Sequence, residues 1–133
     1  MAQLPDLLQL AFTVQHVVAR PEHKQDQPHD IRFKQSLSFA HPGDAPDKIM
    51  LEITLHSDET ESNNHPYQFR LSCLVVLRLA APESGEDDPT EKTKGLGAQI
   101  AIGAMRDHLA TLTARAPWGQ LILPLFVPSV HLE

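Results

Sequence analysis

Cysteine is nearly absent from the sequence. The single cysteine among 133 residues is Cys73, so the chain cannot form an internal disulfide. Cys73 lies in a stretch that alternates apolar and polar residues, where a free cysteine usually acts as a small buried hydrophobe. This usage is typical of a reducing compartment, and we expect a cytoplasmic protein.

Long apolar runs are also absent. No window approaches the ~20 consecutive apolar residues that a membrane-spanning helix needs, so no membrane span is expected. The first residues, Met1 to Asp6, lack the positively charged start and apolar run of a signal peptide. The final Leu132-Glu133 is typical of a cloning scar, and we set these two residues aside.

Positive charge is scarce. The chain has 11 Lys and Arg against 17 Asp and Glu, a formal net charge of −6, and its basic residues form no run. A phosphate backbone is bound mainly by clustered Lys and Arg, so no nucleic-acid partner is expected. A hydrophobic content of 41% is enough for a folded core, and 133 residues match a single domain spanning 1–133.

Recognisable catalytic and metal-binding motifs are missing. There is no G-x-S-x-G elbow, P-loop or dinucleotide fingerprint. The eight histidines include no His-x-His or His-x-x-x-His pair, and the acidic runs lack the spacing of a calcium loop. Asp107 and His108 are neighbours on a predicted helix, where adjacent side chains do not face each other. We therefore expect no enzyme activity, no metal and no cofactor.

Four stretches alternate apolar and polar side chains, which is the period of a strand with one wet face. They are residues 7–19, 31–40, 48–56 and 67–79. Short, turn-like links between them favour an antiparallel meander. In the first stretch the alternation predicts one shared apolar face made of Leu8, Leu10, Phe12, Val14 and Val18. His16, on an otherwise apolar face, is interpreted as a hydrogen-bonded core histidine.

A helix follows the strands. Residues 82–94 form an acidic linker, and Asp88-Pro89-Thr90-Glu91 has the order of a helix start. The apolar helical repeat consists of Ile102, Met105, Leu109, Leu112 and Ala116. Pro117 is predicted to end the helix, and an extended apolar tail follows. The predicted fold is therefore α+β, with a four-stranded antiparallel sheet, one long helix and an apolar tail.

One helix is too narrow to cover such a sheet. A strand of about 13 residues is ~43 Å long and four strands are ~19 Å wide, whereas a helix is only ~10–12 Å across. The helix therefore covers about half of the apolar face. The tail, a second subunit or a bound polypeptide must close the remainder, and composition does not choose among them.

The C-terminal third resembles a known family. Residues 106–116, Arg-Asp-His-Leu-Ala-Thr-Leu-Thr-Ala-Arg-Ala, carry an Arg-acidic pair and a later basic residue on a helix. Residues 118–124, Trp-Gly-Gln-Leu-Ile-Leu-Pro, are similar to an aromatic-Pro-x-Leu-x-Leu segment. With four strands before the helix, the chain resembles the SecB export chaperones, most specifically over residues 102–127.

This resemblance implies an ATP-independent chaperone that grips unfolded or newly made polypeptides, including preproteins, in apolar grooves. It also implies self-association as a dimer or tetramer, with strands joined into larger sheets, and delivery to the SecA translocase motor. The family's zinc-binding C-terminal extension, which touches SecA, has no counterpart after Pro128. Two alternatives stay open: a dedicated chaperone or adaptor for one partner such as an antitoxin, and a structural oligomerisation module without a client.

The expected client-binding residues are apolar side chains of the second strand, the helix end and the tail: Phe33, Phe39, Trp118, Leu121, Leu123 and Phe126. Trp118 has a second interpretation, as a core anchor at the end of the helix. The expected oligomer interface combines the first strand with the helix: Phe12, Val14, Ile102, Met105 and Leu109.

Overall fold

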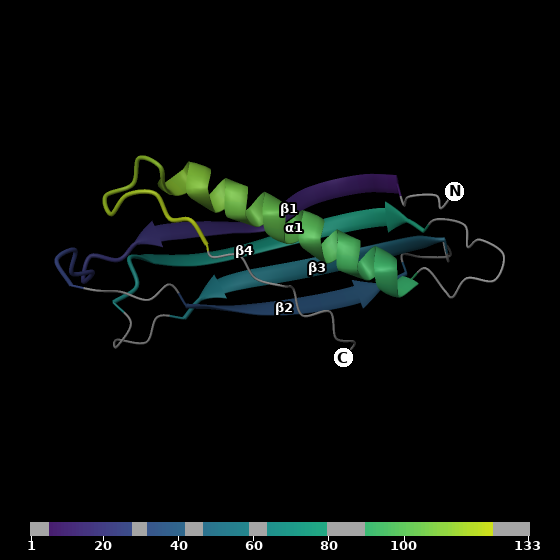
Figure 1. Cartoon of the computed structure of the whole chain (residues 1–133), viewed down its shortest axis with the longest axis horizontal. Coiled ribbons are helices and arrows are strands. Elements are labelled where there is room, and N and C mark those ends of the chain that lie inside the picture. The colour runs from purple at the N-terminus through teal and green to yellow at the C-terminus, as the bar shows by residue number, and fades with distance from the viewer. Residues whose placement is uncertain (1–5, 28–31, 42–46, 59–63, 80–89, 124–133) are drawn as a thin grey trace.

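The computed structural model describes residues 6–27, 32–41, 47–58, 64–79 and 90–123. A four-stranded antiparallel sheet carries one helix across one of its faces (Figure 1). The elements are β1 (Asp6–Ala19), β2 (Phe33–Ala40), β3 (Lys48–Ser57), β4 (Tyr67–Arg78) and α1 (Thr90–Thr113). The predicted α+β architecture is confirmed.

The strand order is β1-β4-β3-β2, so β1 lies beside β4. The predicted meander is correct for β2, β3 and β4 and wrong for β1. The physical reason is the polar link after β1, which is long enough to cross the ends of β4 and β3, a distance of ~14 Å at the usual strand spacing. Three hairpin-connected strands plus one strand placed by a long connection form a Greek key.

The β1–β2 link is fastened to the turn before β4 by Asn64. The Asn64 side chain accepts a hydrogen bond from the Lys24 backbone N–H at 2.9 Å and donates one to the Lys24 carbonyl at 2.8 Å. Asn64 has a φ of 49°, a left-handed conformation that asparagine tolerates better than most residues. The Arg20 amide also donates to the Pro66 carbonyl at 2.9 Å. These bonds hold the end of β1 next to the start of β4.

The hydrophobic core lies between α1 and the two central strands. Alternate side chains of β3 and β4 face the helix, and the apolar ones are 0–1% exposed: Ile49, Leu51, Ile53, Leu55, Tyr67, Phe69, Leu71, Cys73, Val75 and Leu77. Small helix residues allow a close approach. A Cβ at Gly97 would collide with Leu51 and lie 2.9 Å from Leu77, so Gly97 lets the helix sit directly on β3 and β4.

Two β-bulges change the faces of β1. The pairing with β4 shifts between Leu7 and Gln9 and again between Phe12 and Val14, and each shift reverses the alternation of the strand. The prediction of one shared apolar face is therefore wrong. Leu10 and Phe12 pair with core residues of β4 on the helix side, whereas Val14 and Val18 pair with Ser72 and Gln68 on the opposite face. His16 lies on that opposite face and is exposed, so its interpretation as a core histidine is also wrong.

The helix ends at Thr113, before the predicted stop at Pro117. The Thr113 hydroxyl donates to the Leu109 carbonyl at 2.8 Å and accepts a hydrogen bond from the Leu121 amide at 2.7 Å. Thr113 thus couples the last helical turn to the returning chain. Leu121 and Leu123 are then buried, so the first part of the tail closes part of the sheet face. Asp88 and Pro89 of the predicted helix start, and Pro124 and Pro128 of the tail, lie outside the described residues.

Candidate functional site

Exposed apolar side chains are concentrated on β1. Among the residues that the structure describes, eight large hydrophobic side chains are exposed, and five of them belong to this strand: Leu7, Leu8, Leu10, Val14 and Val18. β1 is also an edge strand, because within the described residues only β4 pairs with it. Its outer edge consequently presents backbone donors and acceptors beside apolar side chains on both faces of the sheet.

The other edge strand, β2, has a different surface. Its exposed positions are mostly polar: Lys34, Gln35, Ser36, Ser38 and Ala40. Its large apolar side chains, Phe33, Leu37 and Phe39, are half-buried against the core. Polar and charged residues on an edge discourage pairing with another chain. Within the described sheet, β1 is therefore the edge better suited to contact an apolar polypeptide.

A groove lies on the helix side of β1, next to the C-terminal end of α1. Its volume is about 440 Å³, and its lining is mainly apolar: Gln15, Val17, Ala19, Tyr67, Leu112, Ala116 and Pro117. Leu112 is 46% exposed at the rim. A concave apolar surface with a few polar atoms is the usual form of a binding site.

The inner wall of the groove is rigidly built. The Tyr67 hydroxyl donates to the Gly119 carbonyl at 2.6 Å and accepts from the Trp118 amide at 3.1 Å. The Trp118 indole donates to the Arg20 carbonyl at 3.0 Å. Burial raises the pKa of the Tyr67 phenol, and the hydrogen bond from the Trp118 amide partly opposes this rise. The raised pKa keeps the hydroxyl neutral at physiological pH. Because these bonds join β1, β4 and the helix end, the groove exists before any ligand binds.

A second set of contacts fixes the distance between α1 and β1. The His108 ring stacks on Phe12, with ring centroids 4.5 Å apart and an interplanar angle of 26°. The His108 Nε2 atom also lies 2.7 Å from the Gln15 side-chain oxygen. Gln15 lines the groove, so His108 ties the helix to the groove's polar edge.

The structure does not bring the predicted client-binding residues together in this groove. Phe33 and Phe39 lie on β2, at the opposite edge of the sheet, and the Lys94 ammonium sits 4.0 Å from the centre of the Phe39 ring. Leu121 and Leu123 are 3% and 0% exposed. Trp118 is half-buried and bonded to the Tyr67 hydroxyl behind the groove wall. Phe126 lies outside the described residues.

The predicted interface residues also separate. Ile102, Met105 and Leu109 are 5%, 0% and 0% exposed, packed by the helix against its own sheet. Phe12 is half-buried under His108, and Val14 is 36% exposed on the face away from the helix. Of these five side chains, only Val14 is presented outward by the single chain.

Sequence reasoning did not assign Val17, Ala19, Leu112 or Ala116 to a site. Leu112 and Ala116 belong to the predicted apolar repeat of the helix but lie beyond the central core, where the repeat reaches the sheet edge. Val17 was concealed by the bulges, which turn it toward the helix. The adjacent pair Val17-Val18 was an available signal, because two consecutive apolar residues place one on each face of a strand.

Other site types find little support among the described residues. No three or more of their histidine, cysteine, aspartate and glutamate side chains are grouped as metal ligands. The described helix is not long and apolar enough to cross a membrane.

Comparison with known proteins identifies a similar fold. No family model matches the sequence, and no curated protein matches it. The SecB-like chaperone Rv1957 of Mycobacterium tuberculosis, solved with a ChAD peptide from the Rv1956 HigA1 antitoxin, is similar with a TM-score of 0.68. That similarity covers 95% of this chain and 93% of that chain, at 9% sequence identity.

A second solved structure is a protein of unknown function from Streptococcus agalactiae. It has a TM-score of 0.48 and 14% identity, and the match covers 94% of this chain and 100% of that chain. At these identities the comparisons concern the fold, and the match to Rv1957 supports a SecB-like fold for this chain.

Proposed function

We propose that this protein is an ATP-independent chaperone that binds extended apolar segments of unfolded or newly made polypeptides. The observation that carries the proposal is the exposed apolar edge strand β1 beside a preformed apolar groove. The groove would take apolar side chains of the client, and the free edge of β1 would pair with its backbone.

Both contacts suit a ligand of variable sequence. Burial of apolar area contributes ~25 cal/mol per Å² whatever the exact side chain. Strand addition uses backbone hydrogen bonds that every residue except proline can supply. The net charge of −6 helps to keep a loaded complex soluble and favours clients with basic flanks.

The similar fold of Rv1957, a SecB-like chaperone bound to an antitoxin peptide, supports a polypeptide ligand. It also supports a second candidate function, a dedicated chaperone or adaptor for one partner. The two candidates differ in selectivity, because a dedicated partner would bind tightly and unrelated unfolded proteins would not. Cytoplasmic location, a dimeric or tetrameric assembly and delivery to SecA remain predictions.

An aggregation assay tests the proposal. A chemically unfolded test protein is diluted into buffer with and without this protein, and light scattering is followed without nucleotide. We expect suppression at a near-stoichiometric ratio. No suppression by the folded protein would reject general holding and favour the dedicated-partner function or a purely structural role.

A matched pair of variants tests the location. Leu112 and Leu96 are exposed leucines on the same helix, 46% and 36% exposed, but only Leu112 lines the groove. Leu112→Asp should abolish suppression and Leu96→Asp should retain it, with both variants folded by circular dichroism. Equal losses in the two variants would count against the groove as the binding site.

A further inference from the structure

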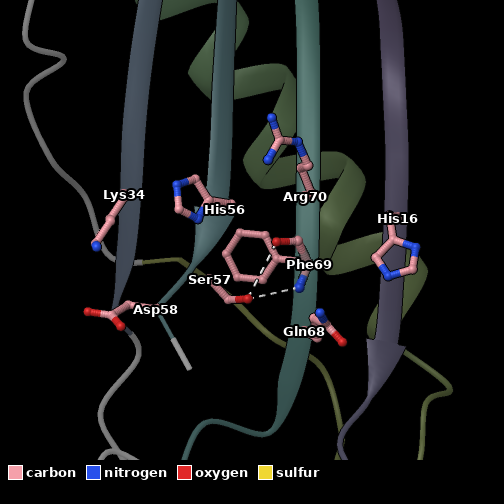
Figure 2. A pocket seen from close by; sticks show the side chains of 8 residues that line it. All are labelled: His16, Lys34, His56, Ser57, Asp58, Gln68, Phe69 and Arg70. Atoms are coloured by element: carbon pink, nitrogen blue, oxygen red, sulfur yellow. Dashed lines mark hydrogen bonds between the residues drawn. The ribbon is translucent and has the colours of Figure 1, made fainter. Parts of the chain in front are cut away.

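The sheet face that points away from α1 carries a row of basic and imidazole side chains. In the strand register, Lys34 of β2 pairs with His56 of β3, His56 pairs with Arg70 of β4, and Arg70 pairs with His16 of β1. Figure 2 shows these four side chains side by side on the four strands, with the helix behind the sheet. We call them the basic row.

The basic row lines a shallow depression with a volume of about 350 Å³. The other lining residues are Ser57, Asp58, Gln68 and Phe69. Ser57 is part of the wall of the depression, since its hydroxyl accepts a hydrogen bond from the Phe69 amide at 3.0 Å. Neighbouring strands are ~4.8 Å apart, so the row is ~14 Å long.

The depression has two basic lining residues, Lys34 and Arg70, against one acidic lining residue. Among the described residues, neither Lys34 nor Arg70 forms an ion pair. In the direction of Thr54 and Ser72, whose hydroxyls bond to each other at 2.7 Å, the next positions along the face are uncharged. Asp58 is the one acidic lining residue. A positive patch therefore stands on a chain with a net charge of −6.

We propose that the basic row binds an acidic segment of a partner polypeptide. Carboxylates of alternate residues in an extended segment are ~6.6–6.8 Å apart, and carboxylates one helical turn apart lie at a similar distance. Either spacing lets two or three carboxylates reach a row of this length. A guanidinium such as that of Arg70 can hold a carboxylate with two parallel hydrogen bonds.

The surrounding charge favours a short acidic peptide over a nucleic acid. The row is short, and a net charge of −6 disfavours the binding of a long polyanion to the chain as a whole. The basic row lies on the face opposite the β1–α1 groove, so this second contact does not depend on the proposed chaperone function.

The test measures fluorescence anisotropy of a labelled octaglutamate peptide, with octaglutamine as the neutral probe. Arg70→Gln is compared with Arg78→Gln, because both arginines are exposed on β4 and both changes remove one positive charge. Arg78 lies away from the row and approaches Asp47, with Nε 3.7 Å from the carboxylate. We expect Arg70→Gln to weaken octaglutamate binding about fivefold and Arg78→Gln less than about twofold.

Lys34→Glu combined with Arg70→Glu should reduce octaglutamate binding below detection, and salt should weaken the wild-type complex. Equal losses for Arg70→Gln and Arg78→Gln would overturn the proposal, because they would indicate general attraction to charge. Binding of octaglutamine as tight as octaglutamate would also overturn it. If a thymidine oligonucleotide binds more tightly than octaglutamate, the proposal is overturned, because the ligand of the row would then be a phosphate chain and not an acidic peptide.

Discussion

β1 and β4 are hydrogen-bonded neighbours of similar apolar content, yet their apolar side chains differ in exposure to solvent. On β4, every second side chain is 0–1% exposed beneath the helix. On β1 no residue is buried, and five large apolar side chains are exposed. An apolar strand sequence therefore indicates that its side chains require burial. The position of the strand in the sheet decides whether another part of the same chain buries them.

The difference arises from where the helix lies. α1 packs mainly on β3 and β4 and reaches β1 only near its C-terminal end (Figure 1). The two bulges then divide the apolar residues of β1 between both faces, so one cover could not hide them all. Bulges also hinder uncontrolled strand pairing at an edge. β1 thus combines an exposed apolar surface with an edge at which the bulges limit pairing with another strand.

The largest expected contrast is in stability. Leu71→Ala on β4 removes a side chain that is 0% exposed and should lower the free energy of unfolding by about 2–5 kcal/mol. Leu10→Ala on β1 removes one that is 36% exposed and should cost less than about 1 kcal/mol. Urea unfolding measures both values. Similar costs would show that β1 is buried in solution, for example by a second copy.

The next contrast concerns the close approach of the helix. Gly97→Ala places a methyl group against Leu51 and Leu77 and should destabilise the fold by about 1–3 kcal/mol. Gly103→Ala meets no atom within 4 Å and should stabilise the helix by up to about 1 kcal/mol. Thermal unfolding of the two variants gives the comparison. A stabilising Gly97→Ala would mean that the helix sits farther from β3 and β4.

Tyr67 is the residue through which β4 contributes to the groove. Tyr67→Phe removes the acceptor for the Trp118 amide and the donor for the Gly119 carbonyl, at a cost of about 1–3 kcal/mol. We expect weaker client holding as well, because the groove wall loses these bonds. Urea unfolding and the aggregation assay provide the two readouts. An unchanged unfolding free energy would contradict the assigned role of the hydroxyl.

The smallest effect concerns the reactivity of the Cys73 thiol in the folded protein. Burial raises the pKa of the Cys73 thiol to about 11, so at pH 8 only about one molecule in a thousand carries the thiolate. Cys73 should react with a thiol reagent only after unfolding. A cysteine placed at the exposed position of Val14, in a Cys73→Ala background, should react readily in the folded protein. Rapid labelling of wild-type Cys73 would show that β4 opens locally.

Much of the fold follows from the sequence because β2, β3 and β4 alternate regularly and the helix has an apolar repeat. The place of β1 does not follow, since a meander and a Greek key both satisfy the same alternation. The bulges at β1 were also hidden, because they depend on pairing with β4. For the site, the sequence predicts an uncovered apolar face and client-binding residues that include Phe33 and Leu121, whereas the groove that we propose as the site is lined by Val17 and Leu112.

Site-specific photo-crosslinking tests whether the β1–α1 groove holds the client polypeptide. A photoreactive amino acid is introduced at Leu112 in the groove or at Leu96 outside it, and each protein is illuminated with a labelled unfolded polypeptide. We expect a crosslink to the polypeptide from position 112 and little crosslinking from position 96. Crosslinks from position 112 that join only two copies of this protein would contradict it, because self-association would then occupy the apolar surface.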